Sequence, residues 1–131
     1  MSIPYITDSI RVNVGNIVAD SDLIEHALYY SPRKIKVVGV RMAVSVAITA
    51  ADTNYQVAKV MNGAVVVGQI ATGPAAGGIS FVKGVFQAAA AIPAAAEQAA
   101  GSTLKLAFAK VGTGMAMTGL IVQIDFYEYD A

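Results

Sequence analysis

The residue types that carry chemistry are sparse in this sequence, and His26 is its only histidine. A hydrolase triad needs a serine or threonine, a histidine and an acid brought together, and the sequence holds no Gly-x-Ser-x-Gly elbow to support one. His26 shares its parity with Ile24 and Leu28, so we expect its ring to face inward as a hydrogen-bonded structural residue. Histidine-based metal sites draw on several ligands. We therefore predict neither a catalytic histidine nor a histidine-based metal site.

The nine acidic residues lie mostly in expected turns or near the C-terminus, where carboxylates cap backbone N–H groups and stay in water. Asp20-Ser21-Asp22 offers oxygen ligands for calcium, but the EF-hand spacing and calcium-binding repeats are absent. Nothing nominates two acids for glycoside hydrolysis. A small barrel enzyme would rest on fold analogy alone. The sequence therefore predicts a protein that is not an enzyme and has no cofactor and no metal.

Two glycine clusters resemble phosphate-binding loops only superficially. Gly112-Thr113-Gly114 precedes an expected strand, so no helix N-terminus follows it to bind a pyrophosphate. The cluster between Gly73 and Gly78 lacks the Gly-Lys-Ser/Thr ending of a P-loop. We interpret both clusters as sharp loops.

Composition excludes several classes of protein. Nine Lys and Arg balance nine Asp and Glu, which argues against a nucleic-acid partner. Cysteine is absent, which excludes disulfides and cysteine-ligated metals. The uncharged stretch Val60–Val82 is interrupted by glycines and Pro74, which argues against a membrane span. The N-terminus has no signal-peptide pattern, so we expect synthesis in the cytoplasm.

Alternation of apolar and polar residues, the period of a β-strand, dominates the chain. Leu104, Leu106 and Phe108 share one parity and are expected inward, and Asn62-Gly63 predicts a tight hairpin. About eight antiparallel strands are expected, forming a sandwich or a barrel. They are Ile10–Val14, Leu23–Tyr30, Lys34–Ala51, Tyr55–Met61, Ala64–Ile70, Ile79–Gln87, Thr103–Lys110 and Leu120–Tyr127.

Two segments depart from this pattern. Ala88–Ala100 is rich in alanine with Pro93 in its middle, which allows either a short helical turn after Pro93 or an irregular strand. Residues 1–8 are expected as an N-terminal arm outside a single domain of residues 9–131. Because this arm holds Ile3, Tyr5 and Ile6 next to Pro4, it is a candidate subunit-clasping segment.

The expected surface is weakly charged, since charged residues make up 14% of the chain against roughly 25% in ordinary domains. Tyr127 and Tyr129 take the outward parity of the last strand, where tyrosine suits an interface. We therefore predict a homo-oligomer or a larger assembly, with contacts that include Ile3, Tyr5, Ile6, Tyr127 and Tyr129.

The C-terminal third resembles a known family of virion proteins. The order of Ala99–Leu106, the loop Lys110–Gly114 and the strand Gly119–Tyr127 is similar to that of jelly-roll capsid decoration, or cement, proteins of tailed bacteriophages. Ile24–Ile48, with Ser31-Pro32-Arg33 between two strands, resembles their opening hairpin. The likeness covers roughly residues 24–129 in pattern and order.

The resemblance implies an antiparallel β-sandwich of jelly-roll type that acts as a non-enzymatic structural protein of the virion. The expected partners are the phage major capsid protein and further copies of the chain, with a homotrimer favoured, on the outer surface of the head. The alternative is a carbohydrate- or receptor-binding β-sandwich of a phage tail or fibre, with Tyr55, Tyr127 or Tyr129 as stacking platforms.

Overall fold

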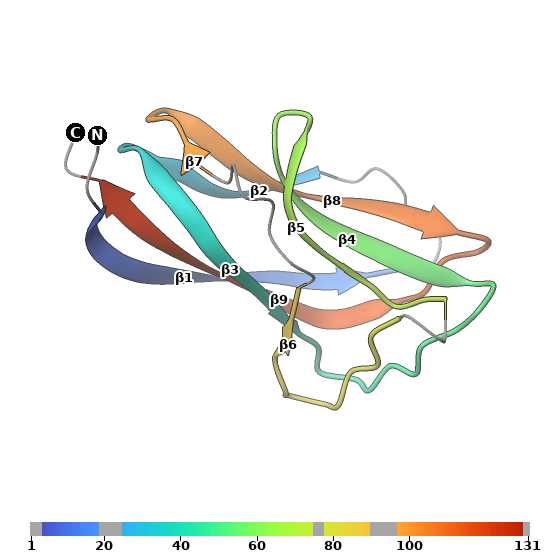
Figure 1. The fold of residues 1–131 in the computed structure, drawn as a ribbon. Coiled ribbons are helices and arrows are strands. Elements are labelled where there is room, and N and C mark those ends of the chain that lie inside the picture. Colours follow the sequence, from blue (N-terminus) through green and yellow to red (C-terminus); the bar gives the residue numbers. More distant parts are fainter. Residues whose placement is uncertain (1–3, 19–24, 75–77, 90–96, 130–131) are drawn as a thin grey trace.

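The computed structural model describes residues 4–18, 25–74, 78–89 and 97–129. They form two antiparallel sheets that pack face to face as a β-sandwich (Figure 1), which confirms the predicted fold class. One sheet has the order β1-β9-β3-β6, with β7 also paired to β3, and the other has the order β2-β8-β4-β5. The strands are β1 (Pro4–Ile17), β2 (Glu25–Ser31), β3 (Ile35–Ala43), β4 (Tyr55–Asn62), β5 (Val65–Ala71), β6 (Gln87–Ala88), β7 (Glu97–Gln98), β8 (Ser102–Val111) and β9 (Met117–Tyr129).

The connections between the sheets follow the jelly-roll pattern. Strands β6 and β7 pair with opposite ends of β3, at Arg41–Met42 and at Ile35–Lys36, and so act as two pieces of one edge strand. Apart from the β4–β5 hairpin, each remaining step along the chain leads from one sheet to the other. This alternation buries the inner face of each strand against a strand of the opposite sheet.

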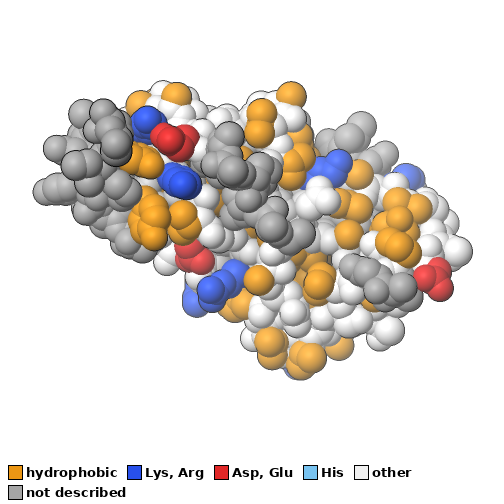
Figure 2. All heavy atoms as spheres, viewed as in Figure 1, with side chains coloured by type: hydrophobic (Ala, Val, Ile, Leu, Met, Phe, Trp, Pro, Cys, Tyr) orange, Lys and Arg blue, Asp and Glu red, His pale blue; other side chains and the backbone are white. Residues whose placement is uncertain are grey.

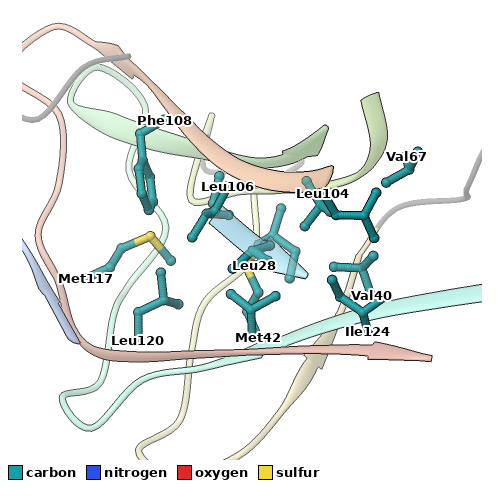
Figure 3. Packing of buried hydrophobic residues seen from close by; sticks show 14 of the residues in the cluster. Leu28, Val40, Met42, Val67, Leu104, Leu106, Phe108, Met117, Leu120 and Ile124 are labelled. Carbon is teal, nitrogen blue, oxygen red and sulfur yellow. The ribbon is translucent and has the colours of Figure 1, made fainter. Parts of the chain in front are cut away.

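The core lies between the two sheets and is built by alternation along the strands. In β8, Leu104, Leu106 and Phe108 point inward as predicted, toward Met117, Leu120 and Ile124 of β9 (Figure 3). Burying one such side chain stabilises the fold by roughly 1.5–3 kcal/mol. The apolar parities of β3, β4, β8 and β9 therefore hold the two sheets together.

The first strand is longer than the sequence predicts. β1 begins at Pro4 and pairs with β9 along its length, from Pro4 opposite Tyr129 to Ile17 opposite Met117. The boundary expected between residues 8 and 9 therefore lies inside a strand, and Pro4–Asp8 belong to the sheet of their own chain. Thr7, Asp8 and Ser9 are three polar residues in a row, so hydrophobic alternation does not indicate that the strand extends back to Pro4.

The predicted hairpin is present, with its turn shifted by one residue. Asn62 pairs with Val65, so the two turn residues are Gly63 and Ala64. Gly63 has a φ of 59°, a left-handed conformation that glycine adopts at little cost. A register shift follows between Val60 and Met61, which gives β5 one extra residue and keeps both strands packed.

The long strand expected over Lys34–Ala51 ends at Ala43. A register shift between Val37 and Gly39 turns Val38 outward, although Val38 alternates in phase with Val40 and Met42, which are buried. Val46 is also exposed, because β3 ends at Ala43 and the alternation of inward and outward side chains does not continue to residue 46. The register shift and the early end of β3 therefore interrupt the alternation of this segment, and its apolar residues of one parity do not all face the core.

The strand expected over Ile79–Gln87 is reduced to an isolated bridge between Ile48 and Phe81 and the two residues of β6. Gly84 has a φ of 74° and donates its N–H to the carbonyl of Val44 at 2.9 Å. Gly84 therefore lies in a turn between the Ile48–Phe81 bridge and β6. Pro93, where a helical turn is one of the two expectations, lies outside the described residues.

Tyr29 of β2 packs into one end of the sandwich, and its ring stacks on Phe126 with centroids 5.3 Å apart. Burial raises the pKa of the Tyr29 hydroxyl above its ordinary value, and the carboxylates of Glu128 and Asp8 raise it further. The folded state therefore holds this proton to a higher pH than the unfolded chain does. Stability from this group is complete below the ordinary tyrosine pKa of about 10 and is lost as the pH rises above it.

We expect the free energy of unfolding to fall above pH 10, and the fall to be shallower in the variant Tyr29→Phe. Urea denaturation at several alkaline pH values measures this slope. Tyr30→Phe is the matched control, because the neighbouring Tyr30 side chain is exposed and should leave the slope of the wild type unchanged. Equal slopes for Tyr29→Phe and the wild type would contradict this assignment.

Candidate interaction surface

The two outer faces of the sandwich differ in chemistry. On the outer face of the β1-β9-β3 sheet, Arg11 donates from Nε to Oε1 of Gln123 at 2.7 Å, and Gln123 donates from Nε2 to Oδ1 of Asp125 at 3.0 Å. Arg41 lies 3.8 Å from Asp125, between its Nε and the carboxylate Oδ2. These polar groups therefore satisfy one another across three strands, and this face is suited to solvent.

Asp125 has room for its carboxylate because the opposite position on β3 is Gly39. A Cβ at Gly39 would lie 3.1 Å from Oδ2 of Asp125, closer than most real contacts. The missing side chain thus lets Asp125 lie flat between its neighbours and face Arg41. Gly39 therefore makes space for the polar network on this face.

On the second sheet, the outer face of β8, β4 and β5 is mostly apolar, and β2 beside it places Glu25 and Ala27 opposite Ala107 and Lys105. In β4, Gln56, Ala58 and Val60 are buried, so the alternating residues point outward. Their register partners in β8 and β5 point the same way, as in the row formed by Ala109, Val57 and Ala71. We call this surface the apolar face; it consists of Tyr55, Val57, Lys59, Met61, Val66, Gln69, Ala71, Lys105, Ala107, Ala109 and Val111.

Lys59 lies near the centre of the apolar face. Its register partners are Ala107 on one side and Gln69 on the other, and Val57 and Met61 precede and follow it on the same side of β4. Lys105 is the other described lysine of this face. An apolar sheet face with so few charges is typical of a surface that another protein covers.

A second apolar feature projects beyond the sheets. Val82 to Val85 form a turn closed by the Val85 N–H donating to the Val82 carbonyl at 3.1 Å, and Val46 belongs to the segment bonded to it at Gly84. All three valines are exposed, Val82 at 62%. Figure 2 shows hydrophobic side chains at this lower tip of the molecule, over the segment that leads into β6. We call this feature the valine turn.

The register brings the described residues among the predicted contacts to one end of the β1-β9 pair. Ile3 lies outside the described residues, and Tyr5 and Ile6 lie in β1 next to the end of β9, where Ile6 pairs with Glu128. Tyr127 is half-buried on the polar outer sheet, between Thr7 and Lys36 in the register. These positions place the arm segment and Tyr127 at the same end of the β1-β9 pair.

Tyr129 is buried, with 5% of its surface exposed, so the outward position expected from its parity is wrong. Two features cover it: the carbonyl of Lys34 accepts its N–H at 2.9 Å, and the Lys34 ammonium lies 5.1 Å from its ring centroid. Lys34 in turn pairs with Glu97 at 2.9 Å. The ring is therefore part of the packing at the end of the sandwich and is not a stacking platform.

His26 faces the core edge as predicted, with its ring edge-on to Phe108 at a centroid distance of 6.4 Å. The predicted hydrogen bond is absent for one nitrogen, because Nε2 is buried without a partner in the described part of the molecule. Among the described residues, no three of the types His, Cys, Asp and Glu cluster as a metal site would require. Over the same residues, no helix has the length and apolar composition to span a bilayer.

The apolar face is a candidate interaction surface that the sequence argument did not single out. Comparison of the chain with models of protein families, with curated proteins and with solved structures found no match in any of the three. The assignment of this surface therefore rests on the register, burial and charge of its own residues.

Proposed function

We propose that the protein is a non-enzymatic structural protein of a virion, a decoration protein that binds the outer surface of a tailed-phage head and stabilises it. The observation that carries this proposal is the apolar face, a sheet surface built from Val57, Met61, Ala109 and their neighbours. The jelly roll is consistent with it, since capsid and lectin domains both use this architecture. A fold alone does not define a function. The chemistry of the surface is therefore what favours a capsid-binding role over a lectin-like role.

The apolar face suits binding to a repetitive protein shell. Each Å² of apolar surface removed from water contributes roughly 25 cal/mol, offset by the loss of translational and rotational freedom on binding. A protein that binds the assembled shell and not its separate subunits stabilises the shell by mass action. On a symmetric lattice, linked copies multiply a modest affinity at each site.

The proposal includes a homotrimer on the shell, as the resemblance implies. A cyclic trimer uses two different patches on each copy, because its contacts are heterologous. The valine turn offers one such patch that is separate from the apolar face. Carbohydrate binding, the alternative expected from the sequence, loses one of its three tyrosine platforms because Tyr129 is buried.

We expect the purified protein to co-sediment with shells of the encoding phage that lack it, and Val57→Asp to abolish the co-sedimentation. The added carboxylate would have to be desolvated at the centre of the contact. Val38→Asp is the matched control, because Val38 is an exposed strand valine of the opposite sheet. Failure of the wild type to co-sediment, or equal loss with both variants, would count against the proposal.

A further inference from the structure

We propose that Asn62 is a site of spontaneous deamidation, and that its hydrogen bond to Gln98 keeps the reaction slow in the folded protein. Asn62 is the only asparagine of the sequence that precedes a glycine; the others precede valine, isoleucine and tyrosine. The backbone nitrogen of the following residue is the atom that attacks the asparagine amide, and glycine has no side chain to shield it. The reactive pair lies at the tip of the β4–β5 hairpin.

The attacking group is the backbone nitrogen of Gly63, which lies in an open turn. Gly63 is exposed and has a φ of 59°. Apart from its two chain neighbours, no residue comes within 4 Å of the position that a Cβ would take. Within the described part of the chain, no turn or loop hydrogen bond uses the Gly63 N–H. Solvent hydroxide therefore has access to this proton.

The reaction needs only water as a co-reactant. Hydroxide removes the Gly63 N–H proton, the nitrogen forms a bond to Cγ of Asn62, and the bond from Cγ to Nδ2 breaks. Ammonia leaves with a proton taken from water, which restores the hydroxide. Water then adds to one carbonyl of the cyclic succinimide and opens it. The products are aspartate and isoaspartate, in which the main chain continues through the side-chain carbons.

The side chain of Asn62 is fixed by a residue of the opposite sheet. Asn62 has the parity of the buried residues Ala58 and Val60, and its Nδ2 donates to Oε1 of Gln98 in β7. Gln98 is 2% exposed, and its strand pairs with β3 at Ile35. For the attack, Cγ of Asn62 has to turn toward the Gly63 nitrogen, which breaks this hydrogen bond. Because a buried acceptor that loses its donor is costly, the bond slows the reaction.

Conversion changes the contact between the two sheets. An aspartate carboxylate has no N–H to donate to Oε1 of Gln98, and isoaspartate adds a main-chain carbon where Asn62 pairs with Val65. Both products weaken the link between β4 and β7, which belong to opposite sheets. We therefore expect the deamidated protein to unfold at a lower urea concentration than the intact protein.

The test incubates the full chain at mildly alkaline pH and follows the exchange of amide for acid at Asn62 by peptide mass spectrometry. We expect Gln98→Leu, which removes the acceptor and keeps a similar volume, to convert roughly fivefold faster or more, the factor expected for one lost hydrogen bond. Glu97→Gln is the matched control, because it changes the exposed neighbour in β7, whose described partner is Lys34, and should convert as the wild type does. Amide hydrogen exchange in β8 confirms that both variants stay folded.

Two further measurements separate the attacking atom from the effect of Gln98. Gly63→Ala places a methyl group beside the nitrogen, so conversion at Asn62 should be slower than in the wild type. The wild type in urea has lost the hydrogen bond and should convert faster than the folded chain, which tests its effect if Gln98→Leu does not fold. An intact Asn62 in urea, an unchanged rate in Gly63→Ala, or equal rates for the folded wild type and either chain without the bond would overturn the inference.

Discussion

Phe108→Ala is expected to lower the free energy of unfolding by about 3–5 kcal/mol, the largest effect of any single substitution considered. Phe108 is 1% exposed and lies between the sheets, where it contacts the core cluster and the edge of the His26 ring. Truncation to alanine removes its buried area and leaves a cavity that strands on both sides hold open. Urea denaturation of the wild type and the variant measures the difference.

Val111→Ala is the matched control for this experiment, because Val111 ends the same strand, β8, with its side chain exposed. Its effect should stay within about 0.5 kcal/mol. If Phe108→Ala does not fold, Phe108→Leu provides a smaller cavity and an intermediate loss. A midpoint for either Phe108 variant equal to that of the wild type would contradict the packing of this core.

Gly119→Ala is expected to cost about 3 kcal/mol, the second large effect. Gly119 begins the inner part of β9 with a φ of 64°, a left-handed conformation that costs an L-residue roughly 1–2 kcal/mol. A Cβ at this position would also lie 2.8 Å from the Cβ of Ser45 and overlap its hydroxyl. Ser45 cannot move freely, because its N–H donates to the carbonyl of Thr118 at 2.9 Å.

Gly63→Ala separates the two causes. Gly63 has a φ of 59°, nearly the same conformation, but nothing lies within 4 Å of the position a Cβ would take. Its loss of stability should be near 1–2 kcal/mol, from conformation alone. Equal losses for Gly119→Ala and Gly63→Ala in urea denaturation would show that the contact with Ser45 has no energetic effect.

The regular strands of this fold can be predicted from the sequence, because apolar side chains that face the core recur at every second residue. Leu104, Leu106 and Phe108 alternate with outward residues, and the alternation alone places them in the core. The Asn62-Gly63 signal likewise finds its hairpin, although the turn begins one residue later. Local rules suffice wherever one strand pairs in register with its neighbours.

The missed features depend on pairing between distant segments. Val38 leaves the core because β3 shifts its register against β9, and the sequence of β3 alone contains no sign of that shift. Tyr129 is buried because Lys34, far away in the chain, bonds to its backbone and covers its ring. Neither contact can be deduced from the period of a single strand.

The apolar face escaped prediction for a different reason. In β4 both parities are largely apolar, since Val57 and Met61 alternate with Ala58 and Val60. Periodicity cannot choose the inner side of such a strand. The choice becomes visible only when β4 is placed beside β8, whose Lys105 and Phe108 lie on opposite sides.

Cryo-electron microscopy of virions with and without this protein tests the central claim most directly. We expect the difference map to show additional density on the outside of the head, shaped as a β-sandwich in groups of three, with the β2-β8-β4-β5 sheet facing the shell. Identical heads, density confined to the tail, or a sandwich that contacts the shell through the polar β1-β9-β3 sheet would contradict the account.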